Sequence, residues 1–138
     1  MDRARRENMD LYNVYFVTGT SYAGKSTLVR NLADRHGGIA LGENYHNAKL
    51  PGLDRREFPN LTYTRDLRDW HDFIRRTPEE YVRWLKDVTK ECETVELRIL
   101  RELLADPATG DRKIFADTNI SIKTLRSISD TGHVLVML

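Results

Sequence analysis

Apolar residues occur along this chain in short runs that alternate with longer segments of helical periodicity. Four runs have the length and composition of buried strands, and they span residues 14–17, 39–41, 113–117 and 134–138. After the first run, Leu28, Val29 and Leu32 place apolar groups on one side of a helix that continues to about His36 and ends at the glycine pair 37–38. Strands that alternate with helices in this way predict an α/β fold with a mostly parallel sheet.

The longest helix is predicted from its N-terminal signal. Thr77 is a favourable N-cap, Pro78 suits the first helical position, and Glu80 stands where a capping box requires a glutamate. Apolar residues then recur every three or four positions in one stripe: Tyr81, Leu85, Val88, Cys92, Val95, Ile99 and Leu103. We expect this stripe to pack against the sheet; the alternative is a seam between two copies of the chain in a homodimer.

The segment that precedes this long helix is less regular. Prolines, a glycine and several charges within residues 47–60 favour a long polar loop. The spacing of Leu67, Trp70 and Ile74 then predicts a modest amphipathic helix over residues 65–76.

One segment matches a motif with a known physical mechanism. Gly19-Thr20-Ser21-Tyr22-Ala23-Gly24-Lys25-Ser26 satisfies G-x-x-x-x-G-K-[ST], and it lies between the first predicted strand and the first predicted helix, as that motif requires. The two glycines allow the loop to wrap around a polyphosphate with its N–H groups inward, and the helix N-terminus adds positive potential. The alternative is a glycine-rich turn that only joins a strand to a helix.

The motif assigns a role to its polar side chains. Lys25 should reach the β- and γ-phosphates, the Ser26 hydroxyl should complete the coordination of Mg²⁺, and Thr27 should cap the helix or touch the α-phosphate. ATP is favoured over GTP, because the sequence contains no guanine-specifying N-K-x-D motif. The expected cofactors are therefore ATP and Mg²⁺, and the expected nucleotide-binding residues are Gly19, Thr20, Ser21, Tyr22, Ala23, Gly24, Lys25, Ser26 and Thr27.

Composition narrows the classes of partner. The 138 residues suit one domain, residues 1–138; 31% are charged and the formal net charge is +1, so nothing favours nucleic acid or an anionic membrane as partner. The single cysteine, Cys92, leaves no partner for an intrachain disulfide and fits a reducing compartment. Residues 1–10 lack the apolar region of a signal peptide, and no stretch reaches membrane-spanning length, so we expect a cytoplasmic protein.

The segment from Val17 to Thr27 resembles the phosphate-binding loop of small P-loop kinases, a group that includes nucleoside, nucleoside-monophosphate, shikimate and gluconate-type kinases. The resemblance covers the sequence of the first strand, the loop and the first helix. In the rest of the chain it is limited to the order of the predicted elements. It implies a three-layer P-loop NTPase fold and most resembles a bacterial branch of such kinase-like proteins.

In that family an arginine-bearing lid, a further strand and a further helix follow the fourth strand. The sequence stops at residue 138, with its fourth predicted strand. We therefore expect that the domain is truncated after this strand and is part of a longer protein. The alternative is that the arginine charge comes from elsewhere in the chain, for example from Arg65, Arg68, Arg75 or Arg76.

The segment that follows the second predicted strand contains three candidates for the acceptor site. Glu43 stands where nucleoside and uridine kinase-like families place an acidic base or acceptor-binding group, which makes it our candidate catalytic carboxylate beside Lys25. Tyr45 and His46 could stack on or hydrogen-bond an acceptor, although either could equally serve packing. The alternative for Glu43 is a solvated loop residue.

Asp117 ends the third predicted strand and resembles the carboxylate that accompanies the metal in P-loop proteins. An unpaired carboxylate at a buried position is costly, so we expect a partner or a metal-bound water beside it, with Ser26 as the second metal-site residue. The alternative is a capping role for the short helix that follows Asp117.

These features predict an ATP-dependent phosphotransferase, a kinase of a small-molecule hydroxyl or phosphate acceptor such as a nucleoside or nucleotide. The first alternative is a nucleotide-binding ATPase or switch that acts on a protein partner through residues 47–60 or the long helical stripe. The second is a binding or structural domain that retains the loop without turnover.

Overall fold

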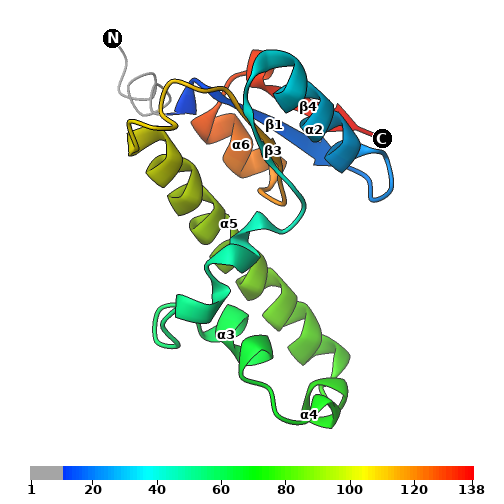
Figure 1. Ribbon diagram of the computed structural model, residues 1–138. Helices are drawn as coiled ribbons and strands as arrows, with labels where there is room; N and C mark the ends of the chain where they lie inside the picture. The colour runs from blue at the N-terminus through cyan, green and yellow to red at the C-terminus, as the bar shows by residue number, and fades with distance from the viewer. Residues whose placement is uncertain (1–10) are drawn as a thin grey trace.

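A computed structural model describes residues 11–138 (Figure 1). Its sheet contains four parallel strands in the order β2-β3-β1-β4: β1 (Val14–Gly19), β2 (Ile39–Leu41), β3 (Ile114–Asp117) and β4 (Val134–Met137). The predicted α/β architecture with a parallel sheet flanked by helices is confirmed. Residues 1–10, and with them the expected absence of a signal peptide, lie outside the described part of the chain.

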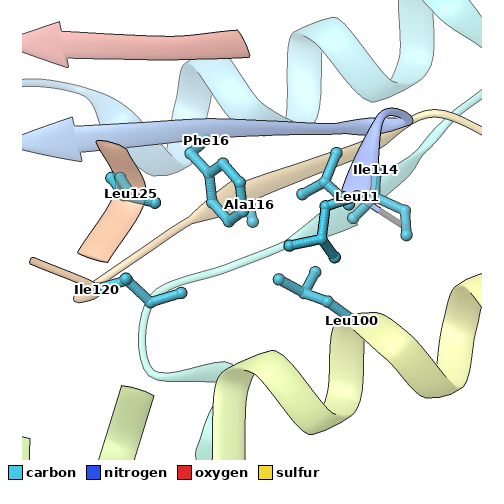
Figure 2. Packing of buried hydrophobic residues seen from close by; sticks show 8 residues of the cluster. Leu11, Phe16, Leu100, Ile114, Ala116, Ile120 and Leu125 are labelled. Carbon is cyan, nitrogen blue, oxygen red and sulfur yellow. The ribbon is translucent and has the colours of Figure 1, made fainter. Parts of the chain in front are cut away.

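Helices cover both faces of the sheet because successive strand residues point to opposite sides. On one face, Val17 and Phe115 pack against Val29 and Ala33 of α2 (Lys25–His36). The other face is covered by α5 (Pro78–Ala105) and α6 (Ile122–Ile128). Figure 2 shows its core, formed by Leu11, Val14, Phe16, Leu100, Ile114, Ala116, Ile120 and Leu125.

Helix α5 begins as its sequence predicts. The Thr77 hydroxyl accepts a hydrogen bond from the Glu80 N–H, and the Glu80 carboxylate accepts one from the Thr77 N–H, which completes the capping box. The helix is 28 residues long, and Figure 1 shows that its first half extends away from the sheet.

The expected packing of the α5 stripe against the sheet is confirmed at Leu103, which packs on the sheet core, and is wrong for most of the other stripe residues. The stripe residues Val88, Cys92, Val95 and Ile99 pack in a separate cluster with Phe58 and Leu61, whereas Leu100 of α5 enters the sheet core. Tyr81 and Leu85, at the distal end of the stripe, are 41% and 45% exposed. The helix therefore serves two cores with two faces, and its N-terminal turns contribute little to either.

The segment before α5 is more ordered than the expected polar loop and single helix. Residues 50–88, which we call the arm, contain a 3-10 turn (Leu50–Gly52), α3 (Pro59–Arg65), α4 (Trp70–Ile74) and the first turns of α5. The expected helix over 65–76 is wrong because residues 66–69 interrupt it. The expected loop over 47–60 is wrong in part because the buried Phe58 anchors it to the arm's apolar cluster.

Long-range polar contacts explain where α3 begins and ends. The Glu91 carboxylate of α5 accepts hydrogen bonds from the backbone N–H groups of Asn60 and Leu61, which lie in the first turn of α3. At the other end, the Arg65 guanidinium donates to the carbonyls of Leu50 and Leu53. Both contacts join residues distant in sequence, so local periodicity does not reveal them.

Strand β4 lies at the edge of the sheet beside β1, with Phe16 in register with Val134. Leu135 and Val136 are about half exposed, unlike the four residues of β3, which are all buried. None of the described helices is long and apolar enough to cross a membrane.

Gly38, between α2 and β2, offers a test of this packing. A Cβ atom there would lie 2.6 Å from the Lys113 carbonyl oxygen and 2.9 Å from the Phe115 ring. We expect Gly38→Ala to lower the free energy of unfolding by about 1–3 kcal/mol in urea titrations, because the Lys113 backbone cannot move away from the added carbon as a flexible side chain could. Gly52→Ala is the matched control, because nothing lies within 4 Å of its added carbon. Equal stability of the two variants would contradict this account of the α2–β2 connection.

Candidate functional site

The glycine-rich loop, residues 19–24, leaves the carboxyl end of β1 under tight backbone constraints. A Cβ atom on Gly19 would lie 1.8 Å from the Met137 carbonyl oxygen, and the Thr20 N–H donates to the same oxygen over 2.8 Å. Gly19 has φ +129° and Gly24 has φ +90°, in the region that favours glycine. The loop thus begins against β4 and delivers the chain into α2 through two positions that need glycine.

The N-terminus of α2 opens from this loop. Its N-cap, Gly24, has no side chain that could accept hydrogen bonds from the first-turn N–H groups. An uncapped N-terminus of a 12-residue helix carries a partial positive charge toward which an anion is attracted. The Lys25 ammonium adds a full charge beside it and donates to the carbonyls of Gly19 and Thr20 over 3.0 and 3.4 Å.

Asp117 lies beside this helix start because β3 pairs with β1. The register places Asp117 opposite Val17, two residues before the loop begins. The residue is 3% exposed, and its Oδ2 accepts a hydrogen bond from the Ser26 hydroxyl over 2.9 Å. Ser26 is therefore the hydrogen-bond partner of Asp117, and the two residues that the sequence analysis assigns to the metal site, 91 positions apart, are in direct contact.

A cavity of about 370 Å³ joins the loop, the helix start and the two strand-end carboxylates, and this volume is in the range of small-molecule sites. It is lined by Ser21, Tyr22, Gly24, Lys25, Ser26, Thr27, Glu43 and Asp117. Glu43 reaches it from the segment after β2 and is exposed to solvent. Gly19, Thr20 and Ala23 belong to the loop but are not among the lining residues.

Tyr45 and His46, the other two candidates for the acceptor site, do not line this cavity. His46 is buried, with its Nε2 atom 3.6 Å from the Cys92 sulfur and its Nδ1 atom 3.6 Å from Glu96 Oε1. The Tyr45 ring packs against the sheet core, and its hydroxyl is buried. Their placement favours the packing alternative over direct contact with an acceptor.

These surroundings raise the pKa values of both side chains. The Cys92 thiol first, and the Glu96 carboxylate second, raise the pKa of His46 to about 9, so that its imidazole carries a proton at neutral pH. Burial, assisted by the charge of Glu96, raises the pKa of the Tyr45 phenol far above its ordinary value, so that this hydroxyl remains neutral.

Sequence reasoning missed Glu96 and its contact with Thr118. Glu96 is fully buried on α5, and its Oε2 accepts a hydrogen bond from the Thr118 hydroxyl over 3.2 Å. The available signal was a carboxylate four residues before Leu100 on the helix face that enters the sheet core. A second missed contact joins Asn119 Nδ2 to Asn44 Oδ1 over 2.8 Å.

The donor set of the cavity fits a hard divalent cation that retains water and phosphate ligands. Ser26 and Asp117 offer a hydroxyl and a carboxylate side by side, the oxygen ligands that Mg²⁺ prefers. Residues 11–138 contain no cluster of three or more histidines, cysteines or acidic residues that could hold a metal alone. Such a cation would complete its coordination with water and the oxygens of a bound ligand.

No protein-family model, curated protein or solved structure matches this chain.

The buried His46 predicts a pH dependence of stability. Because its pKa is raised from 6.5 to about 9 in the folded protein, its contribution is fully present below pH 6.5 and is lost as the pH rises through 9. Between these limits we expect the free energy of unfolding of the wild type to fall by on the order of 3 kcal/mol more than that of His46→Gln.

Urea titrations at several pH values measure this difference. The control is His71→Gln, because the His71 side chain is 76% exposed. Its profile should follow that of the wild type. Parallel profiles of the wild type and His46→Gln would show that the Cys92–His46–Glu96 contacts do not stabilise the imidazolium.

Proposed function

We propose that this protein is an ATP-dependent phosphotransferase built on a P-loop NTPase core, with a small-molecule hydroxyl or phosphate group as acceptor. One observation carries the proposal: four polar residues at or after the ends of three different strands line one cavity at the carboxyl edge of the parallel sheet, namely Lys25, Ser26, Glu43 and Asp117. These residue types supply a cation for phosphate, two oxygens for a metal and a carboxylate for an acceptor.

The topology supports nucleotide binding at this edge. β1 and β3 are neighbours, but the helix after β1 covers one face of the sheet and the helix after β3 covers the other. Connections that diverge in this way leave a crevice at the carboxyl ends of the strands, where ligands bind in open α/β sheets. The glycine-rich loop and the uncapped α2 N-terminus face this crevice with backbone donors suited to a polyphosphate.

Ser26 and Asp117 are the residues that would hold Mg²⁺ together with the nucleotide phosphates. Mg²⁺ bound there would neutralise charge on the phosphates during transfer. Lys25 is within reach of the same cavity and would bind the phosphoryl oxygens, releasing its present contacts with the loop carbonyls.

Glu43 is the proposed base for the acceptor. It lines the cavity from the segment after β2, whereas Lys25 and Ser26 line it from the start of α2, and it is open to the solvent from which an acceptor would enter. In the transfer, the acceptor oxygen forms a bond to the γ-phosphorus, the bond to the β-phosphate oxygen breaks, and Glu43 accepts the proton of the acceptor hydroxyl.

The direct experiment measures ADP release by the purified protein with Mg²⁺ and ATP against a panel of nucleosides, nucleotides, sugars and small hydroxy acids. Release that depends on one class of acceptor would support the kinase and identify its substrate class. Equal release with and without every acceptor would contradict it.

A nucleotide-dependent switch that acts on a protein partner is the second candidate. It is favoured by exposed apolar side chains on the arm, where Trp70 is 61% exposed, Ile74 is 73% exposed and Leu85 is 45% exposed. Such side chains gather at surfaces that contact other proteins. Acceptor-independent ATP hydrolysis, together with partner binding that requires ATP, would favour this candidate over the kinase.

Lys25→Ala tests the phosphate contact. We expect it to reduce phosphoryl transfer by at least 100-fold, because it removes an ammonium group that lines the cavity. The measurement is ADP release at saturating ATP, with Lys49→Ala as the control; Lys49 pairs with Glu102 and does not line this cavity. Wild-type turnover by Lys25→Ala would contradict the proposed site.

Glu43→Gln tests the proposed base separately from nucleotide binding. We expect kcat to fall by about 10²–10⁴-fold while the Kd for a non-hydrolysable ATP analogue changes less than about twofold, because proton transfer is lost and phosphate contacts remain. Glu57→Gln, an exposed carboxylate on the arm, serves as the matched control. A loss confined to nucleotide affinity would assign Glu43 to binding instead.

A further inference from the structure

The most unusual polar residue outside the cavity is Glu96. Its side chain is fully buried near the middle of α5, between the arm and the sheet. One carboxylate oxygen accepts the hydrogen bond from Thr118, and the other lies 3.6 Å from His46 Nδ1. A single buried carboxylate thus contacts the segment after β3 and the segment after β2.

Stability alone does not account for this residue. Three buried side-chain atoms among residues 11–138 lack a hydrogen-bond partner: Tyr45 Oη, His46 Nδ1 and Glu96 Oε1. His46 Nδ1 and Glu96 Oε1 form an ion pair with each other over 3.6 Å, which is longer than a hydrogen bond, and the Tyr45 phenol lies within electrostatic reach of Glu96 and Asp117. Buried charges with incomplete hydrogen bonding destabilise folded proteins relative to apolar groups of similar volume.

Thr118 connects Glu96 to the metal-side residue of the cavity. It directly follows Asp117, and its N–H donates to the Val17 carbonyl over 3.0 Å. Its hydroxyl donates to Glu96 and accepts a hydrogen bond from the Ile120 N–H over 3.1 Å. Glu96 of α5 therefore holds the turn that leaves β3 after Asp117 through its contact with Thr118.

His46 connects Glu96 to the acceptor-side residue. It lies three positions after Glu43, in the 3-10 turn Tyr45–Ala48. The same two segments are joined again at the surface, where Asn119 donates to Asn44. One exposed link and one buried link thus set the separation between the segment that carries Glu43 and the segment that carries Asp117.

We propose that Glu96 is a positioning residue for the transfer reaction: through Thr118 and His46 it holds Asp117 and Glu43 at the separation that the metal-bound nucleotide and the acceptor require. This inference rests on the proposed function. It assigns a role to a group that touches neither nucleotide nor acceptor.

Glu96→Gln is the first test, because glutamine retains the volume and can still accept from Thr118 while the negative charge beside His46 is lost. Binding of a fluorescent non-hydrolysable ATP analogue is titrated with and without Mg²⁺. We expect affinity without Mg²⁺ to stay within twofold of the wild type, and the Mg²⁺ concentration for half-maximal enhancement to rise about 10-fold or more, as when support to metal ligands is removed. With an accepted substrate, kcat should fall similarly.

Glu102→Gln is the matched control. Glu102 is also on α5 and also reaches the segment after β2, where its carboxylate lies 2.8 Å from the Lys49 ammonium, but its side chain is 60% exposed. We expect its Mg²⁺ dependence to equal that of the wild type. An equal shift in both variants would overturn the proposal, since it would show a general effect of charge on α5.

A second pair of variants covers the case in which Glu96→Gln does not fold. Thr118→Val removes the hydroxyl that contacts Glu96, whereas Thr118→Ser retains it. We expect the valine variant to show the raised Mg²⁺ requirement and the serine variant to restore the wild-type value. Equal Mg²⁺ dependence of the two variants would overturn the proposal.

The same titrations separate the two levels of inference. A wild type that binds no ATP analogue at any Mg²⁺ concentration would overturn both the proposed function and the role of Glu96. A wild type that binds the analogue with Mg²⁺-dependent affinity, beside a folded Glu96→Gln with unchanged dependence, would overturn the role of Glu96 alone.

Discussion

The close packing of β1 between β3 and β4 is the constraint on which the candidate site depends. Parallel pairing with β3 brings Asp117 beside the end of β1, and contact with β4 leaves no space for a side chain at Gly19. The chain can leave β1 at this point only as a tight glycine-containing turn, which then starts α2 with Ser26 against Asp117. The Ser26–Asp117 contact is thus a consequence of strand order.

Helix α5 extends this arrangement beyond the sheet. Its C-terminal half contributes Leu100 to the sheet core, while Val95 and neighbouring stripe residues hold Phe58 and Leu61 of the arm. Since one continuous helix belongs to both clusters, a displacement of the arm must either bend α5 or move its C-terminal half against the sheet. Glu96 lies in the part of the helix where the two clusters meet.

Local rules predicted what local interactions determine. The glycine-rich loop and the capping box at Thr77 depend on neighbouring residues, the four strands are marked by short apolar runs, and all appear where the sequence places them. The arm was predicted poorly because Glu91 and Arg65 hold α3 through contacts across 30 and 15 residues. Residues 47–60 were predicted as a loop because they contain prolines, a glycine and several charges, and this composition gave no indication that Phe58 is buried.

The placement of the candidate site residues, too, was predicted correctly in one part and wrongly in another. Lys25 and Ser26 follow from a motif, and Asp117 and Glu43 follow from their positions at strand ends, since parallel strands present their carboxyl ends at one edge. Tyr45 and His46 were assigned to the acceptor because they adjoin Glu43, but the turn after Asn44 directs the His46 imidazole into the interior. Adjacency in sequence does not determine direction where the backbone turns, and Asn44 has φ +57°.

Within residues 11–138, the buried side-chain atoms without a hydrogen bond, in Tyr45, His46 and Glu96, lie together beside the candidate site, and this placement has a cost in stability. A domain of this size is stabilised by a net free energy of only about 5–15 kcal/mol, so a buried carboxylate with one oxygen that meets its partner, His46, only over 3.6 Å represents a substantial fraction of the margin. That cost is concentrated at the junction of α5 with the segments that carry Glu43 and Asp117. An apolar group at position 96 would relieve it, but it would leave Thr118 and His46 without the atom that relates them to each other. The geometry of the two strand-end carboxylates and the stability of the core therefore place opposing demands on the same side chain.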